Sequence, residues 1–306
     1  MPYNINTALK CSICPRECNI DRKTRTGFCR TGAKLKVAKA YLHKWEEPCI
    51  SGHNGSGAVF FSGCNLSCIY CQNYRISQQN YGTELSPGHL GKVFLSLQAK
   101  GAHNINLVSP SHFIPQIREA ITEVSDELTI PIVYNSNGYD SIRGLKLMDG
   151  LVNVYLPDFK YFNNETSLKY SNVSDYFETA TAAISEMYRQ VGKIEFDGNG
   201  IIKRGLIIRH LILPYHTNES IKILDWIKSN LPADGIMISL MSQYTPLYKA
   251  EYYKELDRRI IKREHEKVIN HFIKAGFPEG YIQERTAAEE KYVPDFNLEG
   301  LLPGEL

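Results

Sequence analysis

The chain has 306 residues, of which 43% are hydrophobic and 22% charged. These proportions are typical of a soluble globular protein with one large domain or two average ones. The 35 Lys and Arg residues nearly balance 33 Asp and Glu residues, so the net charge of +2 gives no general argument for binding nucleic acid or an anionic membrane. No apolar run reaches the roughly 18 residues that span a bilayer, and the first ten residues lack the apolar core of a secretory signal. We therefore expect a cytoplasmic protein without a membrane partner.

The first predicted element is a Cys-rich segment over residues 1–55, which we expect to form a small metal-binding subdomain. It contains Cys11, Cys14, Cys18 and Cys29. Disulfides are a poor explanation, because disulfide frameworks belong mainly to short secreted chains. Four thiolates can saturate a zinc ion, a single iron or an auxiliary [4Fe-4S] cluster, and free thiols are the remaining alternative. We call these four cysteines the quartet, and the metal that they would bind stays open.

Three more cysteines follow the first predicted strand: Cys64, Cys68 and Cys71, with the spacing C-x3-C-x2-C. Three thiolates at this spacing can hold three irons of a [4Fe-4S] cube and leave the fourth iron open for chemistry. The alternative is a zinc knuckle with one remote ligand, although zinc sites usually use paired C-x2-C units. We call these three cysteines the triad. Cys49, between the two groups, is more typical of a small buried hydrophobic residue than of a ligand.

From residue 58 onward, short apolar runs alternate with amphipathic stretches at helical spacing. This pattern predicts parallel βα units in an α/β fold, arranged as a barrel or as a doubly wound open sheet. Polar residues follow nearly every strand, and in a barrel those strand ends meet on one face. Their convergence favours the barrel. The predicted strands are 58–61, 105–108, 131–134, 152–156, 206–213 and 236–241, and the predicted helices are 90–97, 114–124, 173–191, 221–227 and 252–275.

Several motifs resemble one known superfamily. The triad with its aromatic residue, within FFSGCNLSCIYCQNYRIS, resembles the radical S-adenosylmethionine (SAM) enzymes, in the branch related to pyruvate formate-lyase activating enzymes. HKWEEPCISG, NGSGAVFFSG, VYNSNGY, VYLPDFKY, RHLILP, SLMSQYTP and VPDFNLEG resemble, in this order, a stand-alone activating-enzyme-like group of iron-sulfur proteins. The resemblance runs from about Cys11 to about Gly300. It implies a TIM-like partial (β/α)6 barrel over residues 56–306, including a C-terminal helix and tail.

The resemblance also implies an activity. A [4Fe-4S] cluster on the triad would bind SAM and cleave it reductively to a 5'-deoxyadenosyl radical, which abstracts hydrogen from a protein or other substrate. Activation of a glycyl-radical enzyme and modification of a peptide, RNA or small molecule both remain open. We expect an electron donor such as flavodoxin or ferredoxin, and we do not expect nucleic acid as a partner. The non-enzymatic alternative is a zinc-binding module for nucleic acid or protein.

The resemblance places cofactor-binding residues around the triad. Tyr70 matches the aromatic residue that packs near adenine, and we add its neighbours Gln72 and Asn73 as candidates. Ser109 and Ser111 lie where many relatives have a Gly-Gly-Glu segment that holds the SAM amino group. Because this sequence has no carboxylate there, a hydroxyl or backbone carbonyl must replace it.

Two later strand ends supply further cofactor-binding candidates. Asn135 and Asn137 resemble a Thr-Asn-Gly segment that contacts the ribose and carboxylate region, with a plain turn as the alternative. Asp158 and Lys160 resemble an Asp-Leu-Lys segment. That resemblance implies that the lysine pairs with the SAM carboxylate and that the aspartate faces the substrate. The alternative is an ordinary exposed ion pair.

The apolar run at 206–213 contains Arg209 and His210, and a charged residue there needs a reason. Strand alternation puts the two side chains on opposite faces, so at most one points into the barrel. We expect Arg209 to pair with the SAM carboxylate and His210 to be a satisfied core residue. Beyond the cluster, our candidates for catalytic groups are Asp158 and His112.

Overall fold

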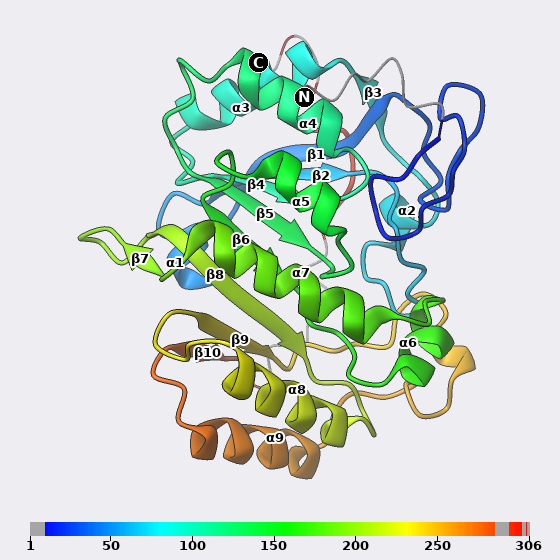
Figure 1. Cartoon of the computed structure of the whole chain (residues 1–306), viewed down its shortest axis with the longest axis vertical. Helices are drawn as coiled ribbons and strands as arrows, with labels where there is room; N and C mark the ends of the chain where they lie inside the picture. Colours follow the sequence, from blue (N-terminus) through cyan, green and yellow to red (C-terminus); the bar gives the residue numbers. More distant parts are fainter. Residues whose placement is uncertain (1–9, 285–293, 302–303, 305–306) are drawn as a thin grey trace.

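The structure is a computed structural model in which residues 10–284, 294–301 and 304 are described. Strands and helices alternate along most of this part of the chain (Figure 1). The strands are β1 (Leu35–His43), β2 (Ser56–Phe61), β3 (Thr83–Leu85), β4 (Ile105–Val108), β5 (Ile132–Ser136), β6 (Val154–Pro157), β7 (Glu195–Phe196), β8 (Ile202–Leu211), β9 (Met237–Met241) and β10 (Gly280–Ile282). The helices are α1 (Pro48–Ser51), α2 (Tyr74–Ser77), α3 (Pro87–Ala99), α4 (Ile114–Glu123), α5 (Ile142–Met148), α6 (Asn164–Ser171), α7 (Tyr176–Val191), α8 (Thr217–Asn230) and α9 (Lys262–Ala275), with a 3-10 turn η1 (Ala250–Tyr252).

The strands form one mixed sheet in the order β10-β9-β8-β6-β5-β4-β2-β1-β3, and β7 pairs with β8. Neighbours from β10 to β2 pair in parallel, whereas β1, β3 and β7 are antiparallel. The six strands predicted from the apolar runs are β2, β4, β5, β6, β8 and β9. Each is followed by a helix before the next parallel strand, so the prediction of an α/β fold with a partial (β/α)6 barrel is confirmed.

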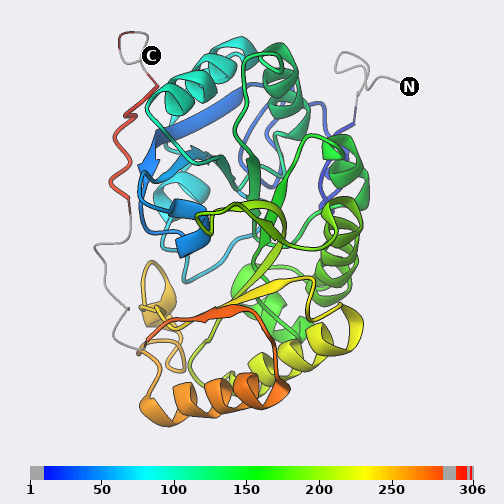
Figure 2. The same cartoon turned by 90° about the vertical axis from the view of Figure 1, so that its left-hand side faces the viewer.

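Both faces of the parallel strands β2, β4, β5, β6 and β9 are buried, as is typical of parallel sheets. On β5 and β6, Tyr134 and Tyr155 belong to the large core cluster shared with the helices, whereas Val133 and Val154 belong to a second cluster. Figure 2 shows the helices following the convex side of the curved sheet. The second cluster therefore lies on the concave side. It contains Cys49, which is 3% exposed and packs as the buried hydrophobic residue that we expected.

One predicted helix is wrong in its first half. The expected helix at 252–275 is replaced by η1, an irregular stretch and then α9, which begins at Lys262. The Glu264 carboxylate accepts a hydrogen bond from the Ile261 backbone N–H at 3.0 Å. This contact satisfies a backbone donor before the first turn and sets the helix start there.

The segment at 10–34 has few regular elements and packs against the mouth of the barrel through arginines. Arg16 Nε donates to the Asn65 carbonyl at 2.8 Å, and Arg30 Nη2 donates to Ser67 Oγ at 2.7 Å. Arg22 Nη1 donates to the carbonyl of His112 at 2.6 Å. Within the described residues, every helix is too short or too polar to cross a bilayer.

Candidate functional site

The triad lies on the loop that leaves the C-terminal end of β2. This loop turns at Gly63, whose φ of +84° favours glycine. A Cβ on Gly63 would lie 2.4 Å from the Cys29 carbonyl oxygen and 2.6 Å from Thr31 Cγ2. The quartet segment is therefore in direct contact with the turn that begins the triad loop.

Each triad sulfur has a hydrogen-bond partner on a different neighbouring element. Asn137 Nδ2, after β5, lies 3.3 Å from Cys64 Sγ. Ser171 Oγ, at the end of α6, donates to Cys68 Sγ at 2.9 Å. The third sulfur, on Cys71, lies 3.2 Å from the hydroxyl of Ser77 on α2.

The three thiols line one cavity with about 1080 Å³ of empty space at the carboxyl ends of the strands. Burial raises the pKa of Cys64 to about 12 and that of Cys71 to about 11, and it raises the pKa of Cys68 as well. The metal-free thiols are therefore protonated at neutral pH, and binding iron must release these protons.

These residues fit a [4Fe-4S] cluster. Three thiols meet at one cavity, and hydrogen-bond donors stand ready for the sulfurs, as iron–sulfur sites require. In the described chain no three His, Cys, Asp or Glu side chains already stand as a ready metal-ligand group. The thiols would therefore turn about their Cα–Cβ bonds to ligate iron.

Opposite the triad, a buried charged network closes the cavity. Asp158, after β6, lies beside Arg209 of β8 in an isolated parallel bridge. Arg209 Nε donates to Asp158 Oδ1 at 2.8 Å, and Arg209 Nη2 donates to Asn135 Oδ1 at 2.6 Å. Lys160 Nζ donates to Asp158 Oδ2 at 2.7 Å. The Lys160 side chain is 17% exposed, so the alternative of an ordinary exposed pair does not describe it.

Opposite charges hold this network ionised. Burial alone would raise the pKa of Asp158, but Arg209 and Lys160 outweigh it and keep that pKa below its usual value. Burial would lower the pKa of Lys160, but Asp158 and the nearby Cys68 outweigh burial and raise it. Asp158 pairs with both cations, and Glu46, which lies outside this cavity, also pairs with Arg209. Lys160 and Arg209 therefore face the cavity within a balanced network and can bind an anionic group only through their remaining N–H donors.

Tyr70 begins a hydrogen-bonded chain that ends on a triad sulfur. Its hydroxyl lies 2.5 Å from that of Tyr161, which lies 2.6 Å from Ser171 Oγ, the donor to Cys68. Tyr70 and Tyr161 are buried, and burial raises the pKa of both hydroxyls well above their usual values. The two phenols therefore stay protonated. Through their hydrogen bonds they position the Ser171 hydroxyl that donates to Cys68 Sγ.

The structure brings most of the predicted residues to the cavity and leaves two out. Ser111 is hydrogen-bonded to the buried carboxyl of Asp140 instead of lining the cavity. His112 lies beneath the triad turn, with Nε2 at 2.8 Å from the Ser62 carbonyl, and burial lowers its pKa to about 3. Of the predicted residues, those that line the cavity are Cys64, Cys68, Tyr70, Cys71, Gln72, Asn73, Ser109, Asn135, Asn137, Asp158, Lys160 and Arg209.

The quartet gathers beside the triad loop. Cys14 and Cys29 are buried, and Cys11 and Cys18 are half-buried. Cys18 Sγ and Cys29 Sγ each lie 3.5 Å from the point where Gly27 would carry a Cβ, and Cys18 Sγ accepts a hydrogen bond from the Phe28 N–H at 3.5 Å. Burial, and then the neighbouring Cys29, Cys11 and Cys18, raise the pKa of Cys14 to about 12.

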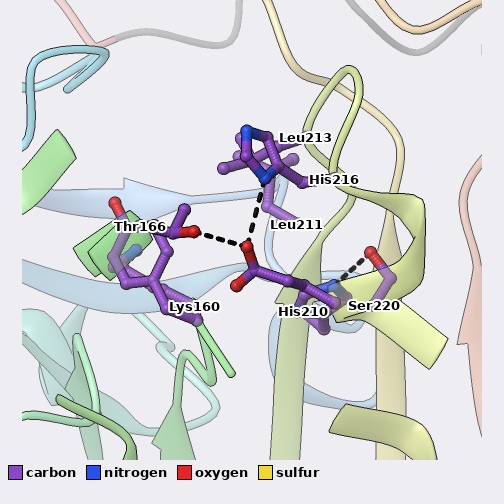
Figure 3. Close-up of a pocket in the computed structure, with 9 residues that line it drawn as sticks. Lys160, Thr166, His210, Leu211, Leu213, His216 and Ser220 are labelled. Carbon is purple, nitrogen blue, oxygen red and sulfur yellow. Dashed lines mark hydrogen bonds and ion pairs between the residues drawn. The ribbon is translucent and has the colours of Figure 1, made fainter. Parts of the chain in front are cut away.

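A second, smaller pocket lies behind Lys160, with about 190 Å³ of empty space (Figure 3). His210 faces this pocket, opposite to its neighbour Arg209. His210 Nδ1 lies 2.7 Å from the Phe159 carbonyl and Nε2 lies 2.8 Å from Ser220 Oγ, so both ring nitrogens have partners. Burial lowers the pKa of His210 to about 4, and the ring is neutral at pH 7.

Several residues of the cavity wall were not among the predicted site residues. Gln243, Tyr244 and Thr245 follow β9 and line the cavity. They belong to SLMSQYTP, a motif that carried the family resemblance, and their position at a strand end was the available signal. Glu46 was not predicted either, although it is the more important residue. Arg209 Nη1 donates to Glu46 Oε2 at 3.1 Å, and the two residues are 163 positions apart in the sequence.

Comparison with known proteins agrees with this geometry. Residues 58–227, more than half of the chain, match the radical SAM superfamily, and the chain belongs to that superfamily. The uncharacterized protein MJ0674 of Methanocaldococcus jannaschii is 32% identical over 282 residues, which cover 86% of this chain and 74% of the relative. Membership implies an enzyme that uses SAM together with a [4Fe-4S] cluster.

One solved structure of SuiB from Streptococcus suis shares the fold. SuiB bound to its precursor peptide SuiA has a TM-score of 0.50 at 10% identity, over 72% of this chain and 46% of that chain. SuiB bound to S-adenosylmethionine has a TM-score of 0.47 at 10% identity, over 72% and 48%. This chain thus spans less than half the length of the SuiB chains that it matches.

Proposed function

We propose that this protein is an activating-enzyme-like radical SAM oxidoreductase that abstracts hydrogen from a protein or another substrate. The observation that carries the proposal is the meeting of the three triad thiols with Lys160, Arg209 and Asp158 at one cavity. When bound, SAM and the cluster supply one-electron cleavage of a carbon–sulfur bond, giving methionine and a 5'-deoxyadenosyl radical that takes a hydrogen atom from the substrate. The family resemblance of the motifs supports the activating-enzyme type.

The chain's own residues bind and orient the cofactor. Cys64, Cys68 and Cys71 would hold the cluster, and Lys160 and Arg209 are the cations placed to pair with the SAM carboxylate. Asp158 fixes both cations through separate oxygens, which prepares the site before SAM arrives.

Uncharged groups complete the cofactor site. Asn135, Asn137, Gln72, Asn73 and the hydroxyl or carbonyl of Ser109 supply neutral hydrogen-bonding groups for the amino group and the ribose. Tyr70 closes the cavity near the triad and would pack against adenine, where it also excludes water.

We assign a second metal to the quartet, as iron-sulfur, iron or zinc. A four-thiolate site has no open ligand position, so its role is to hold the N-terminal segment or to pass electrons. Contacts of Arg16 and Arg30 with the triad loop support either role. We also propose that the enzyme works in the cytoplasm and that flavodoxin or ferredoxin supplies the electron.

The test is SAM cleavage under anaerobic conditions, with dithionite as reductant and 5'-deoxyadenosine as the measured product. Cys64→Ala, Cys68→Ala and Cys71→Ala should each abolish the product, because a three-thiolate site cannot lose a ligand and keep the cluster. Cys49→Ala is the matched control, since that thiol is also buried but lies outside the cavity. Product formation by a triple Ala variant of the triad would contradict the proposed function.

A further inference from the structure

A further space, which we call the chamber, lies beside the cofactor cavity. It has about 550 Å³ of empty space, counting the part that is open to solvent. His43, Trp45 and Glu46, at the end of β1 and in the loop after it, form one wall, and Pro294 of the C-terminal segment lies at another. The two spaces share six lining residues: Gln72, Asn73, Val108, Asn135, Arg209 and Gln243. A group held in the chamber would therefore lie directly next to the cofactor.

Glu46 lines the chamber, and its partner Arg209 lines both spaces. Arg209 Nη1 donates to Glu46 Oε2 at 3.1 Å. Asn106 Nδ2 and Asn135 Nδ2 donate to Glu46 Oε1 at 3.1 and 3.3 Å. Burial raises the pKa of Glu46, and Arg209 and the Asn106 hydrogen bond act against that rise. Both oxygens accept hydrogen bonds and one faces a guanidinium, which is the geometry of a carboxylate paired with a cation.

The charges that line the chamber cancel. Glu46 and Arg209 are its only ionised lining residues in the described chain, and they pair with each other. Burial, together with Arg209 and Lys39, lowers the pKa of His43 to about 4, so that ring is neutral at pH 7. A charged guest would lose its hydration here without meeting an unpaired opposite charge.

The other polar groups are mainly carboxamides, on Gln72, Asn73, Asn135 and Gln243. The Asn135 carboxamide is already engaged at both ends, by Arg209 and Glu46. Gln72 and Asn73 border both spaces and can serve SAM or the chamber, whereas Gln243 is the carboxamide that we do not assign to the cofactor. Asn73 Oδ1 is buried and has no hydrogen-bond partner among the described residues. A side-chain carboxamide offers a donor and an acceptor side by side, which matches another amide.

The arrangement of the aromatic side chains does not favour a nucleobase as the ligand of the chamber. The ring of Phe60 is occupied by Tyr41, stacked at 6.1 Å between centroids, and by Phe296 at 5.6 Å. Trp45, 66% exposed, is the aromatic wall that faces outward. A nucleobase would lack a second face on which to stack, whereas a small amide needs none.

We propose that this chamber is the substrate chamber and that it takes an uncharged carboxamide group of the substrate, from a peptide bond or from a primary amide. This proposal rests on the proposed function in one respect, namely that the molecule in the chamber is called a substrate. The chamber itself is a binding site whether or not SAM is cleaved.

Four small probes of nearly the same shape test the charge argument: acetamide, N-methylacetamide, acetate and acetamidinium. Their binding to the full-length, cluster-loaded protein with saturating SAM is measured by saturation transfer to the probe methyl protons. The better amide should bind about tenfold more tightly than either ion, because only the ions lose hydration without compensation. Stronger binding of N-methylacetamide assigns a peptide bond, and stronger binding of acetamide assigns a primary amide.

Glu46→Gln keeps the shape of the side chain and removes its charge. Arg209 then keeps only Asp158 as a carboxylate partner, and Asp158 is shared with Lys160, so one positive charge of the network is unbalanced. Acetate should then gain about tenfold in affinity, while the amides change little. Glu47→Gln is the matched control, because Glu47 is the neighbouring buried carboxyl and does not line the chamber. In that variant the order of the probes should stay as in the unmodified protein.

Three results would overturn the proposal: stronger binding of either ion to the unmodified protein, no amide binding, or loss of amide binding when SAM is added. The last result would make the chamber part of the cofactor site. Probe binding is measured without turnover, so loss of SAM cleavage with an intact probe order would count against the proposed function alone.

Discussion

The two cysteine groups lie side by side but in different surroundings. The triad thiols line a cavity, and their sulfurs contact Asn137, Ser171 and Ser77 from three separate elements. The quartet thiols contact mainly their own segment, and they line neither the cofactor cavity nor the chamber. A site that the whole barrel holds open is suited to chemistry, whereas a site that a short segment closes on itself is suited to structure or electron transfer.

The largest effect is expected when two cysteines of the quartet are replaced, and this change separates the role of the quartet from that of the triad. Cys11→Ala together with Cys14→Ala should remove the second metal and loosen the N-terminal segment, while SAM cleavage survives at least in part. The reason is that the triad ligands remain intact. Metal analysis and the 5'-deoxyadenosine assay measure the two outcomes. Unchanged metal content in this variant would show that the quartet binds none.

The contact between the two regions should be sensitive to a single methyl group. Gly63→Ala adds a Cβ only 2.4 Å from the Cys29 carbonyl and should cost more than about 3 kcal/mol of unfolding free energy. Gly150→Ala has nearly the same φ, +81°, but nothing within 4 Å, and should cost only about 1 kcal/mol. Urea unfolding compares the two variants, and equal losses would mean that the contact is unimportant.

Removing one of the two cations that line the cofactor cavity tests the cofactor site. Lys160→Ala should weaken SAM binding by roughly 1.5 to 3 kcal/mol, about ten- to a hundredfold, with normal cluster content. Lys193→Ala removes a lysine from an exposed pair with Asp234 and should change binding by less than about 0.5 kcal/mol. Anaerobic titration with SAM measures both, and wild-type affinity in Lys160→Ala would exclude that lysine from the site.

A buried histidine between the two regions should make stability depend on pH. His112 has an ordinary pKa of 6.5 when unfolded and about 3 when folded, because it is buried. Below pH 6.5 the unfolded chain therefore binds an additional proton, and stability falls by about 1.4 kcal/mol per pH unit until the pH nears 3. Between pH 7 and pH 5, His112→Gln should lose about 2 kcal/mol less unfolding free energy than the unmodified protein. An equal loss in both would contradict this origin.

Much of the fold followed from local patterns. The apolar runs marked β2, β4, β5, β6, β8 and β9 because buried parallel strands are continuous apolar segments. β1, β3, β7 and β10 were not predicted. Lys36 and Lys39 interrupt the apolar run of β1, and the other three strands have only two or three residues, none of them buried. The helix over 252–275 began too early, because Leu256 and Ile260 are buried at helical spacing within an irregular segment.

The site was predictable where motifs sit at strand ends. Cys64, Cys68 and Cys71 could be placed by spacing alone, and Lys160 and Arg209 by their position after or within strands. Ser111 and His112 were placed in the site because they adjoin Ser109, but the chain turns there and buries both side chains. Glu46 could not be assigned, because only the folded barrel brings its loop to Arg209.

The C-terminal segment also protects the sheet. Residues 294–301 run beside β1 (Figure 2), where Leu298 N–H donates to the Ala38 carbonyl and Ala40 N–H donates to the Glu299 carbonyl. β3 covers only Leu35–Val37 of the outer edge of β1. Without the C-terminal segment, the rest of that edge would present unpaired backbone groups, and such an edge recruits strands of other molecules. Shortening or tagging this end of the chain should therefore promote aggregation before it affects the fold of the barrel.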